Sequence, residues 1–179
     1  RQWGEESPKL ADIAILQAQV ALQRDNAQDG VAFAGEAQRL FGKSRQTAHY
    51  VAATCLLAQA QSAQELENPV AVQNAELCMS IATRQKLPQL QTHAVAMANL
   101  SMDRNDIAQA DQRLKIATAA SKTSSAGLVL AWLRLQDLQK SFALDDAVFD
   151  RVQATLNEQV PPQQDLLRAS NALRANYYC

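Results

Sequence analysis

The two histidines of this chain, His49 and His93, belong to the residue type best suited to acid–base catalysis or metal binding near neutral pH. On a helix, further ligands for a metal would come from positions three or four residues away. Neither histidine has a Cys, an Asp or the other His at those positions. The sequence therefore predicts no metal site, and we interpret both residues as surface or hydrogen-bonded side chains.

The three cysteines, Cys55, Cys78 and Cys179, form an odd set without the spacing of a metal site. Cys55 and Cys78 lie within apolar helical runs, where a free thiol behaves as a small hydrophobic side chain. We therefore interpret both as buried free thiols. Free thiols are typical of a reducing compartment, so the sequence predicts an intracellular protein, either cytoplasmic or nuclear.

Asp145 and Asp146 form an adjacent carboxylate pair that could suggest acid–base chemistry. Neighbouring residues on a helix diverge by about 100°, and acidic residues are favoured at helix starts, so capping explains the pair better. The chain has no Gly-rich phosphate loop, no nucleophile elbow and no His-Glu metal motif. We expect no catalytic residues, no cofactor and no enzymatic activity.

Charge gives little guidance toward a partner. The formal net charge is −1 and the pI is near 6.1, so no general attraction to nucleic acid is expected. Arg39, Lys43 and Arg45 surround Gly42 and form a possible basic edge for an acidic partner or phosphate, although a solvated turn explains them as well. No apolar run approaches the roughly 20 residues of a membrane span, so no membrane partner is expected.

Composition predicts the elements that must position any site. The chain has 33 Ala and 22 Gln against 5 Gly and 5 Pro, a balance that favours helix at most positions. Capping residues and breakers such as Asn68-Pro69, Gly42 and Leu87-Pro88 divide the chain into paired helices. We predict one all-α domain over residues 1–179. Because the sequence starts at Arg1 and not at Met, we expect it to be a fragment of a longer protein or a processed product. Its hairpins should span about residues 8–41, 44–86, 88–122 and 123–158, with a capping helix over 163–176.

The helix predicted from Ser44 to about Leu66 is apolar or small at nearly every position between Tyr50 and Ala58, with Thr54 the exception. A helix without a polar face is surrounded by other helices. We therefore expect it to be the central helix of the first half. The side chains predicted to be buried across the chain are Val51, Cys55, Met97, Ala98, Ala110, Leu114 and Trp132.

A repeat is visible in the middle of the chain. Ile81-Ala82-Thr83 recurs 35 residues later as Ile116-Ala117-Thr118, within the period expected of stacked helical hairpins. Ala98, Ala110, Leu114 and Ala117 are separated by 12, 4 and 3 residues, with Ile107 at the turn. This small, small, large, small pattern resembles the tetratricopeptide repeat. The resemblance implies a right-handed superhelix of stacked antiparallel helix hairpins.

The resemblance also implies a binding groove lined by the first helix of each hairpin. The matching positions are Thr92, Val95, Asn99, Met102, Leu130 and Arg134. Asn99 and Arg134 are the candidate polar contacts, and the remaining basic residues of a clamp for acidic chaperone tails are missing. The expected function is a non-catalytic scaffold that holds a peptide or helix of another protein.

Two narrower similarities suggest where such a scaffold could act. Residues 120–122 and 135–140 are similar to late repeats of the helical-repeat subunit of the cohesin loader, which implies a subunit of a larger assembly. The drifting hairpins are also similar to the sensor region of regulators related to the maltose activator. That similarity implies the alternative function, a ligand- or peptide-sensing domain of a transcriptional regulator.

Overall fold

The structure is a computed structural model that describes residues 8–44, 46–121 and 125–139, together with positions 150, 153, 154, 168, 171 and 174. The described ranges contain helices and turns and no strand, which confirms the all-α prediction for them. No helix in these ranges combines the length and the apolar character needed to span a membrane. The helices are α1 (Pro8–Gln23), α2 (Ala27–Ser44), α3 (Thr47–Gln64), α4 (Pro69–Arg84), α5 (Leu90–Asp103), α6 (Ile107–Ala119) and α7 (Ala126–Leu138).

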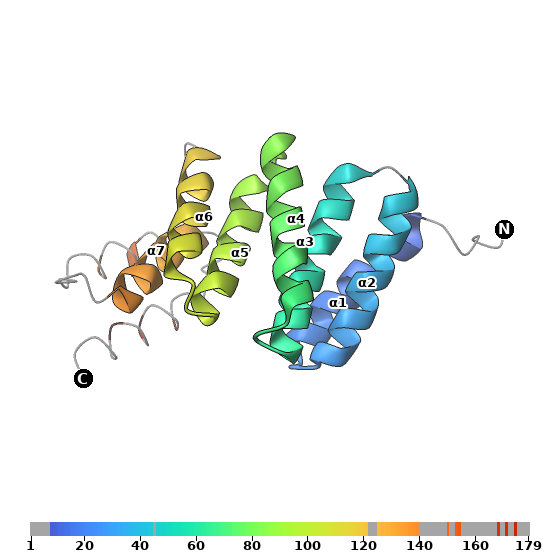
Figure 1. Cartoon of the computed structure of the whole chain (residues 1–179), viewed down its shortest axis with the longest axis horizontal. Coiled ribbons are helices and arrows are strands. Elements are labelled where there is room, and N and C mark those ends of the chain that lie inside the picture. The colour runs from blue at the N-terminus through green and yellow to red at the C-terminus, as the bar shows by residue number, and fades with distance from the viewer. Residues whose placement is uncertain are drawn as a thin grey trace.

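Consecutive helices pack as neighbours along the long axis of the molecule (Figure 1). The closest pairs are α1 with α2, α2 with α3, α3 with α4, and α5 with α6. Odd-numbered helices also contact one another, α1 with α3, α3 with α5 and α5 with α7. The odd-numbered helices therefore form a continuous row, which we call the odd-helix row.

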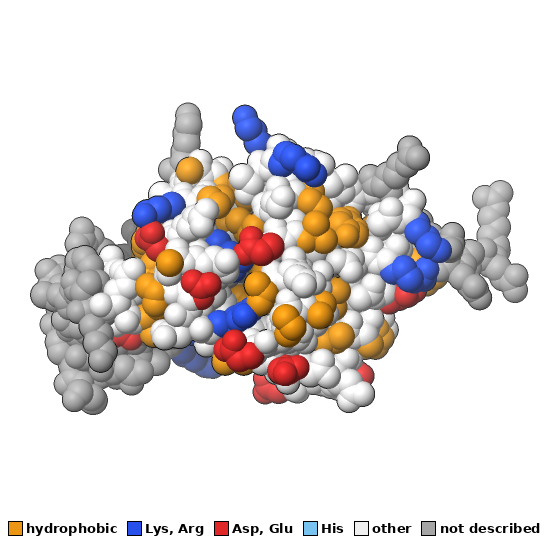
Figure 2. All heavy atoms as spheres, in the orientation of Figure 1, with side chains coloured by type: hydrophobic (Ala, Val, Ile, Leu, Met, Phe, Trp, Pro, Cys, Tyr) orange, Lys and Arg blue, Asp and Glu red, His pale blue; other side chains and the backbone are white. Residues whose placement is uncertain are grey.

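One face of the molecule mixes apolar, basic and acidic side chains (Figure 2). Acidic and basic groups are interspersed on it, with apolar surface between them. No large region of a single sign is seen on this face. This distribution agrees with the small formal net charge of −1.

Side-chain caps begin three of the helices where the sequence places capping residues. The Asn68 side chain accepts a hydrogen bond from the backbone N–H of Val70 at 2.9 Å, with Pro69 as the first residue of α4. Asp106 caps α6 by accepting from Gln109 N at 3.1 Å. Ser125 caps α7 by accepting from the Leu128 backbone. The three caps satisfy backbone donors that helix starts leave without an intrahelical partner.

The turns use left-handed residues other than glycine. Asp25, Lys86 and Asn105 have φ angles of 55°, 49° and 57°, and they follow α1, α4 and α5 respectively. No described glycine has a positive φ. A glycine commonly ends a helix by adopting the left-handed conformation. Gly42 does not adopt it, and α2 continues through Gly42. The prediction that α2 ends at Gly42 and that Ser44 opens the next helix is therefore wrong, since Ser44 is the last residue of α2.

The central position predicted for α3 is confirmed. Its residues from Val51 to Ala58 are buried apart from Ala52, and the helix contacts α1, α2, α4 and α5. The Thr54 hydroxyl donates to the carbonyl of Tyr50 at 2.8 Å and accepts from Gln38 Nε2 at 2.9 Å. The one polar side chain in this buried stretch is thus fully hydrogen-bonded, as burial requires.

Alanine fills the closest contacts between helices. Ala98 and Ala110 are both fully buried, where α5 meets α6. Ala82 and Ala117, which are 35 residues apart in the repeat, are also both fully buried. Gly30 extends the same pattern, because an added Cβ there would lie 3.3 Å from the Cβ of Ala60. Short side chains at these positions allow the helices to approach closely.

Six of the seven predicted core residues are buried, and Trp132 is the exception. Its ring is half-buried against the core, and its Nε1–H donates to Thr118 Oγ1 at 3.1 Å. An indole N–H needs a polar partner, which keeps one end of the ring near the surface. The predicted helices over residues 145–158 and 163–176 lie outside the ranges that the structure describes continuously.

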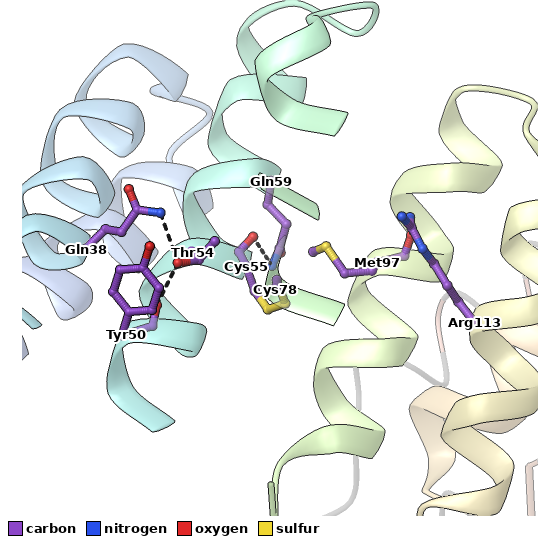
Figure 3. Close-up of a disulfide and its surroundings, with 8 residues drawn as sticks. All are labelled: Gln38, Tyr50, Thr54, Cys55, Gln59, Cys78, Met97 and Arg113. Atoms are coloured by element: carbon purple, nitrogen blue, oxygen red, sulfur yellow. Dashed lines mark hydrogen bonds between the residues drawn. A yellow bond between two sulfur atoms is a disulfide. The ribbon is translucent and has the colours of Figure 1, made fainter. Parts of the chain in front are cut away.

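The interpretation of Cys55 and Cys78 as free thiols is wrong, because a disulfide joins them (Figure 3). Their Cα atoms are 5.4 Å apart, a separation typical of disulfides. The bond connects α3 to α4 inside the apolar core, 23 residues apart in sequence. Sequence reasoning treated the two cysteines as separate hydrophobic positions, whereas their pairing depends on how the two helices pack.

We expect the replacement of Ala98 or Ala110 by Leu to destabilise the protein by about 1 to 3 kcal/mol, because the larger side chain would force α5 and α6 apart. Urea unfolding followed by circular dichroism would measure the change. Ala108→Leu is the matched control, since Ala108 is exposed on the same helix as Ala110. An Ala98 or Ala110 variant as stable as this control would contradict the close packing.

We also expect unreduced, denatured protein to show one thiol per chain in a thiol titration, against three after reduction. Closing a loop of this length restricts the unfolded chain, so the double variant Cys55→Ala with Cys78→Ala should lose about 2 to 4 kcal/mol of stability. Equal thiol counts before and after reduction of freshly purified protein would show that the disulfide is absent.

Candidate functional site

Two adjoining cavities lie along the odd-helix row and form its main hollow among the described residues. Their volumes are about 630 and 540 Å³, and both are lined by Leu22, Gln59, Thr92 and Ala96. We call the combined hollow the odd-helix groove. The first cavity is also lined by Ser62, Ala63, Leu66, Val95, Asn99, Leu100 and Asp103, and the second by Ile15, Gln19, Gln23, Ala52, Cys55, Leu56 and His93.

The lining of the groove combines apolar side chains with uncharged amides. Leucines come from both α1 and α3, and the amides of Gln19, Gln23, Gln59 and Asn99 come from α1, α3 and α5. Asp103 is the one charged residue among the described lining residues. Its carboxylate is already paired with the guanidinium of Arg134 at 2.5 Å. The groove is therefore close to electrically neutral.

Two residues that line the groove each have one polar atom that is buried without a hydrogen-bond partner among the described residues. The atoms are the hydroxyl of Ser62, a residue of the first cavity, and Nε2 of His93, a residue of the second. The Ser62 residue is 5% exposed. Buried polar atoms nearly always have partners, because leaving one unpaired costs free energy. Both atoms are covered by surrounding atoms, so a molecule in the groove would not reach them without a rearrangement.

Burial also lowers the pKa of His93 from its ordinary value, because desolvation disfavours the charged imidazolium. The imidazole is thus neutral at neutral pH. The prediction of a surface or hydrogen-bonded side chain is right for His49, which is exposed and lies with its ring centroid 5.1 Å from that of Phe41. It is wrong for His93, whose position on α5 turns its ring into the row of helices.

Ser62 and His93 do not form a hydrogen bond with each other, since both atoms are unpartnered. A nucleophile and its base need such contact for covalent catalysis. Ser62 and His93 are therefore not a hydrogen-bonded nucleophile–base pair. Gln59, which lines both cavities, donates from Nε2 to the carbonyl of Cys55 at 3.3 Å.

Three of the six residues predicted for the binding groove lie together in it. Thr92, Val95 and Asn99 follow one another on successive turns of α5 and all line the first cavity. Thr92 is exposed, and the other two are half-buried. Their spacing of three and four residues places them on one face of the helix.

The other three predicted groove residues lie elsewhere. Met102 and Leu130 are buried in the protein, with 3% and 7% exposure. Met102 follows Ala98 by four residues and therefore shares its buried face, and Leu130 stands in the same relation to Ala126. Arg134 touches the site indirectly, through its ion pair with Asp103.

The possible basic edge is partly neutralised within the chain. Arg39 makes two hydrogen bonds to the Glu36 carboxylate, at 2.6 and 2.8 Å. The hydrogen bond from Arg39 lowers the pKa of Glu36, with smaller contributions from the charges of Arg39 and Lys43. Lys43 is exposed in the last turn of α2, and Arg45 lies outside the described residues.

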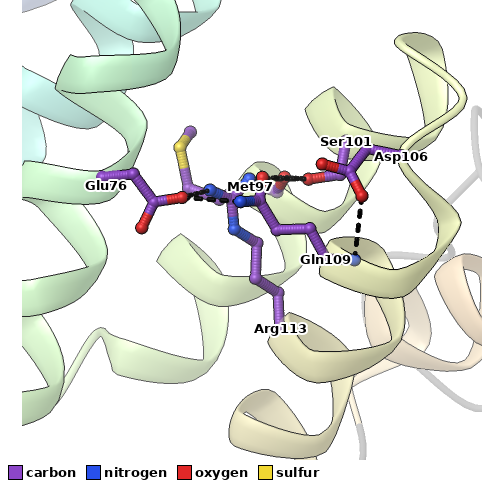
Figure 4. Close-up of polar contacts among 6 residues, drawn as sticks. All are labelled: Glu76, Met97, Ser101, Asp106, Gln109 and Arg113. Carbon is purple, nitrogen blue, oxygen red and sulfur yellow. Dashed lines mark hydrogen bonds and ion pairs between the residues drawn. The ribbon is translucent and has the colours of Figure 1, made fainter.

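A second polar cluster connects α4 to the hairpin formed by α5 and α6 (Figure 4). Arg113 is 4% exposed. Its guanidinium donates to the carbonyl of Met97 at 2.8 Å, to Ser101 Oγ at 2.7 Å and to the Glu76 carboxylate at 2.8 Å. Gln109 also donates to Glu76, at 2.7 Å. Burial lowers the pKa of Arg113, and the neighbouring Glu76 carboxylate opposes that effect. The cluster is a satisfied network that fixes the position of two hairpins.

Sequence reasoning overlooked both Ser62 and Arg113, although helical spacing contains a signal for each. Arg113 falls three residues after Ala110 and four before Ala117, on the face predicted to be buried. Ser62 falls four residues after Ala58, again on a buried face. A polar residue on an apolar face indicates a special partner or a binding role. The sequence does not reveal which of the two applies.

Comparison with known proteins found no matching family model, no matching curated protein and no matching solved structure.

Arg113 and Arg134 allow a buried and a more exposed arginine ion pair to be compared in their contribution to the free energy of unfolding. We expect Arg113→Ala to destabilise the protein by about 2 to 4 kcal/mol, because it removes three hydrogen bonds from a buried network. Arg134→Ala should cost less than about 1 kcal/mol, since its ion pair is exposed. Urea unfolding of both variants would measure the difference. Equal losses would argue against the network as the joint between the hairpins.

Proposed function

We propose that this chain is a non-catalytic interaction module that holds a segment of another polypeptide in the odd-helix groove. The observation that carries the proposal is the extended groove itself, two adjoining cavities lined by side chains of α1, α3 and α5. An extended groove across three helices suits a polymer better than a small compact molecule. The amide side chains along it can hydrogen-bond to peptide groups.

The proposal includes a superhelical arrangement similar to that of tetratricopeptide repeats. Two observations support it. The residues of the Ile-Ala-Thr triplets have matching environments on α4 and α6, with the isoleucines half-buried, the alanines buried and the threonines exposed. The odd-helix row also continues from α1 to α7. A row of this kind creates an extended binding surface in repeat proteins.

The surface of the chain favours a protein partner over nucleic acid. Charges of both signs are interspersed on the face shown in Figure 2, and the formal net charge is −1. Nucleic-acid binding depends on a basic patch that neutralises phosphates. A nearly neutral surface instead selects partners through shape and hydrogen bonding.

The disulfide changes the proposed compartment. The prediction of an intracellular protein depended on free thiols at Cys55 and Cys78, and these residues are joined. Disulfides form and persist mainly in oxidising environments. The proposed role therefore belongs in an oxidising compartment, which disfavours a subunit of a nuclear or cytoplasmic assembly.

Thr92→Arg tests the proposed role. Thr92 is exposed and lines both cavities, so the variant should fold normally while a long charged side chain occupies the groove. Gln73→Arg is the matched control, because Gln73 is exposed on α4 and lines neither cavity. Photo-crosslinkers placed at the two positions in the full chain, followed by mass spectrometry of extracts from the source cells, would identify the bound polypeptide.

We expect one polypeptide to crosslink from position 92 and not from position 73. The same polypeptide should be captured by the wild type and by Gln73→Arg, with at least a tenfold loss for Thr92→Arg. Capture that is unaffected by Thr92→Arg, with crosslinks near Arg39 and Lys43, would move the binding surface to the basic edge and contradict the proposal.

A further inference from the structure

A separate cavity adjoins the Arg113 network, between α4 and the hairpin of α5 and α6. Its volume is about 190 Å³, below the roughly 300 Å³ at the lower end of pockets for drug-sized ligands. Its charged lining residues are Glu67, Arg104, Asp106 and Arg113. None of these four residues lines the odd-helix groove. The cavity is therefore a second candidate site, and its size suits a small molecule.

Arg104 is the charged group of this cavity with unused donors. Its side chain is 19% exposed, and Oε2 of Glu67 lies 3.9 Å from its Nη2, too far for a hydrogen bond. Among the described residues, no acceptor is hydrogen-bonded to the Arg104 guanidinium. A guanidinium presents five donors in a planar fork and binds a carboxylate through two of them. Arg104 can therefore bind the carboxylate of a molecule in the cavity.

Glu67 and Asp106 place negative charge at the same cavity. The Glu67 side chain is 75% exposed, and Asp106 is exposed as well. Asp106 accepts from the Gln109 backbone through Oδ1 (Figure 4), and no described residue donates to its Oδ2. An ammonium group has three donors and no acceptor, so it suits these free carboxylate oxygens.

The more deeply buried polar residues of the lining are already hydrogen-bonded. Arg113 and Ser101 are 4% and 2% exposed, and both belong to the network around Glu76. Burial lowers the pKa of Arg113 most and Glu76 opposes it, while Asp106 and Arg104 add smaller effects of opposite sign. Arg104 and Asp106 therefore lie within electrostatic reach of Arg113, and a ligand would meet the accessible groups in front of it.

We propose that this cavity binds a free α-amino acid, with Arg104 on its carboxylate and with Asp106 and Glu67 on its ammonium group. A simple anion would meet two carboxylates beside Arg104, and a simple cation would meet Arg104 itself, so like charges disfavour both. A zwitterion matches both signs. A peptide terminus carries only one of the two charges, so a free amino acid fits better.

The remaining lining selects among amino acids. Val72 is half-buried and Leu100 is 6% exposed, and together they supply an apolar wall. An aliphatic side chain gains free energy by leaving water against such a wall. The small volume excludes large aromatic side chains.

Thermal unfolding of the full chain with each standard L-amino acid, followed by calorimetric titration of those that raise the melting temperature, would test the proposal. A ligand that binds only the folded state raises that temperature. We expect an amino acid with an aliphatic side chain to do so and to bind as one molecule per chain. Its N-acetyl form lacks the ammonium and its amide form lacks the carboxylate, so each should bind at least about tenfold more weakly.

Variants locate the site. Arg104→Met removes the positive charge, and Asp106→Asn removes a negative charge while it keeps a good capping residue for α6. Each should weaken binding at least about tenfold, with little change in the melting temperature without ligand. Glu67→Gln alters an exposed side chain that does not threaten folding, and should weaken binding about twofold to fivefold. Arg84→Met is the control, because Arg84 is exposed on α4 outside the cavity.

Several outcomes would overturn the proposal. One is an unchanged melting temperature with every amino acid, and another is binding that the Arg104, Asp106 and Glu67 variants leave intact. Equal binding of the N-acetyl form would show a simple anion site, and equal binding of the amide a simple cation site. Binding that Thr92→Arg abolishes would place the amino acid in the odd-helix groove instead.

Discussion

Close approach of helices through alanine is the constraint on which the rest of this structure depends. Aromatic residues make up 5% of the chain, so large rings cannot fill wide gaps between helices. Ala82, Ala98, Ala110 and Ala117 are fully buried instead, and they allow neighbouring helices to lie near each other. Helices this close must match in shape over their whole length, because interiors are tightly packed and a single added methylene has to be accommodated. The odd-helix row and the groove on it follow from that arrangement.

Two parts of the molecule contain buried polar groups, and they differ in whether those groups are hydrogen-bonded. Arg113 lies in a network where each contact has good geometry, and that network joins α4 to the hairpin of α5 and α6. Ser62 and His93 are buried in the groove without partners. A protein interior rarely leaves such atoms unpaired, so these two residues contrast with the hydrogen-bonded cluster around Arg113.

The disulfide links the stability of the fold to the groove. Cys55 lines the second cavity and is bonded to Cys78 on α4, so the wall formed by α3 is covalently fixed to the helix behind it. Because the disulfide already restricts this wall, less conformational entropy would be lost if a ligand ordered the groove. A smaller entropy loss would favour binding. Gln59, one turn after Cys55, extends this fixed surface by donating to the Cys55 carbonyl.

The sequence by itself determined the helices, their approximate bounds and most of the core. These features depend on local propensity and on spacing within one helix, which is why the buried stretch of α3 and the caps at Asn68 and Ser125 were predictable. Only the tertiary structure decided which surfaces meet. The pairing of Cys55 with Cys78, the contacts of Arg113 and the unpartnered state of Ser62 all depend on side chains from different helices or on the space between helices. Periodicity shows which face of a helix is buried, but it does not specify the neighbour that buries it.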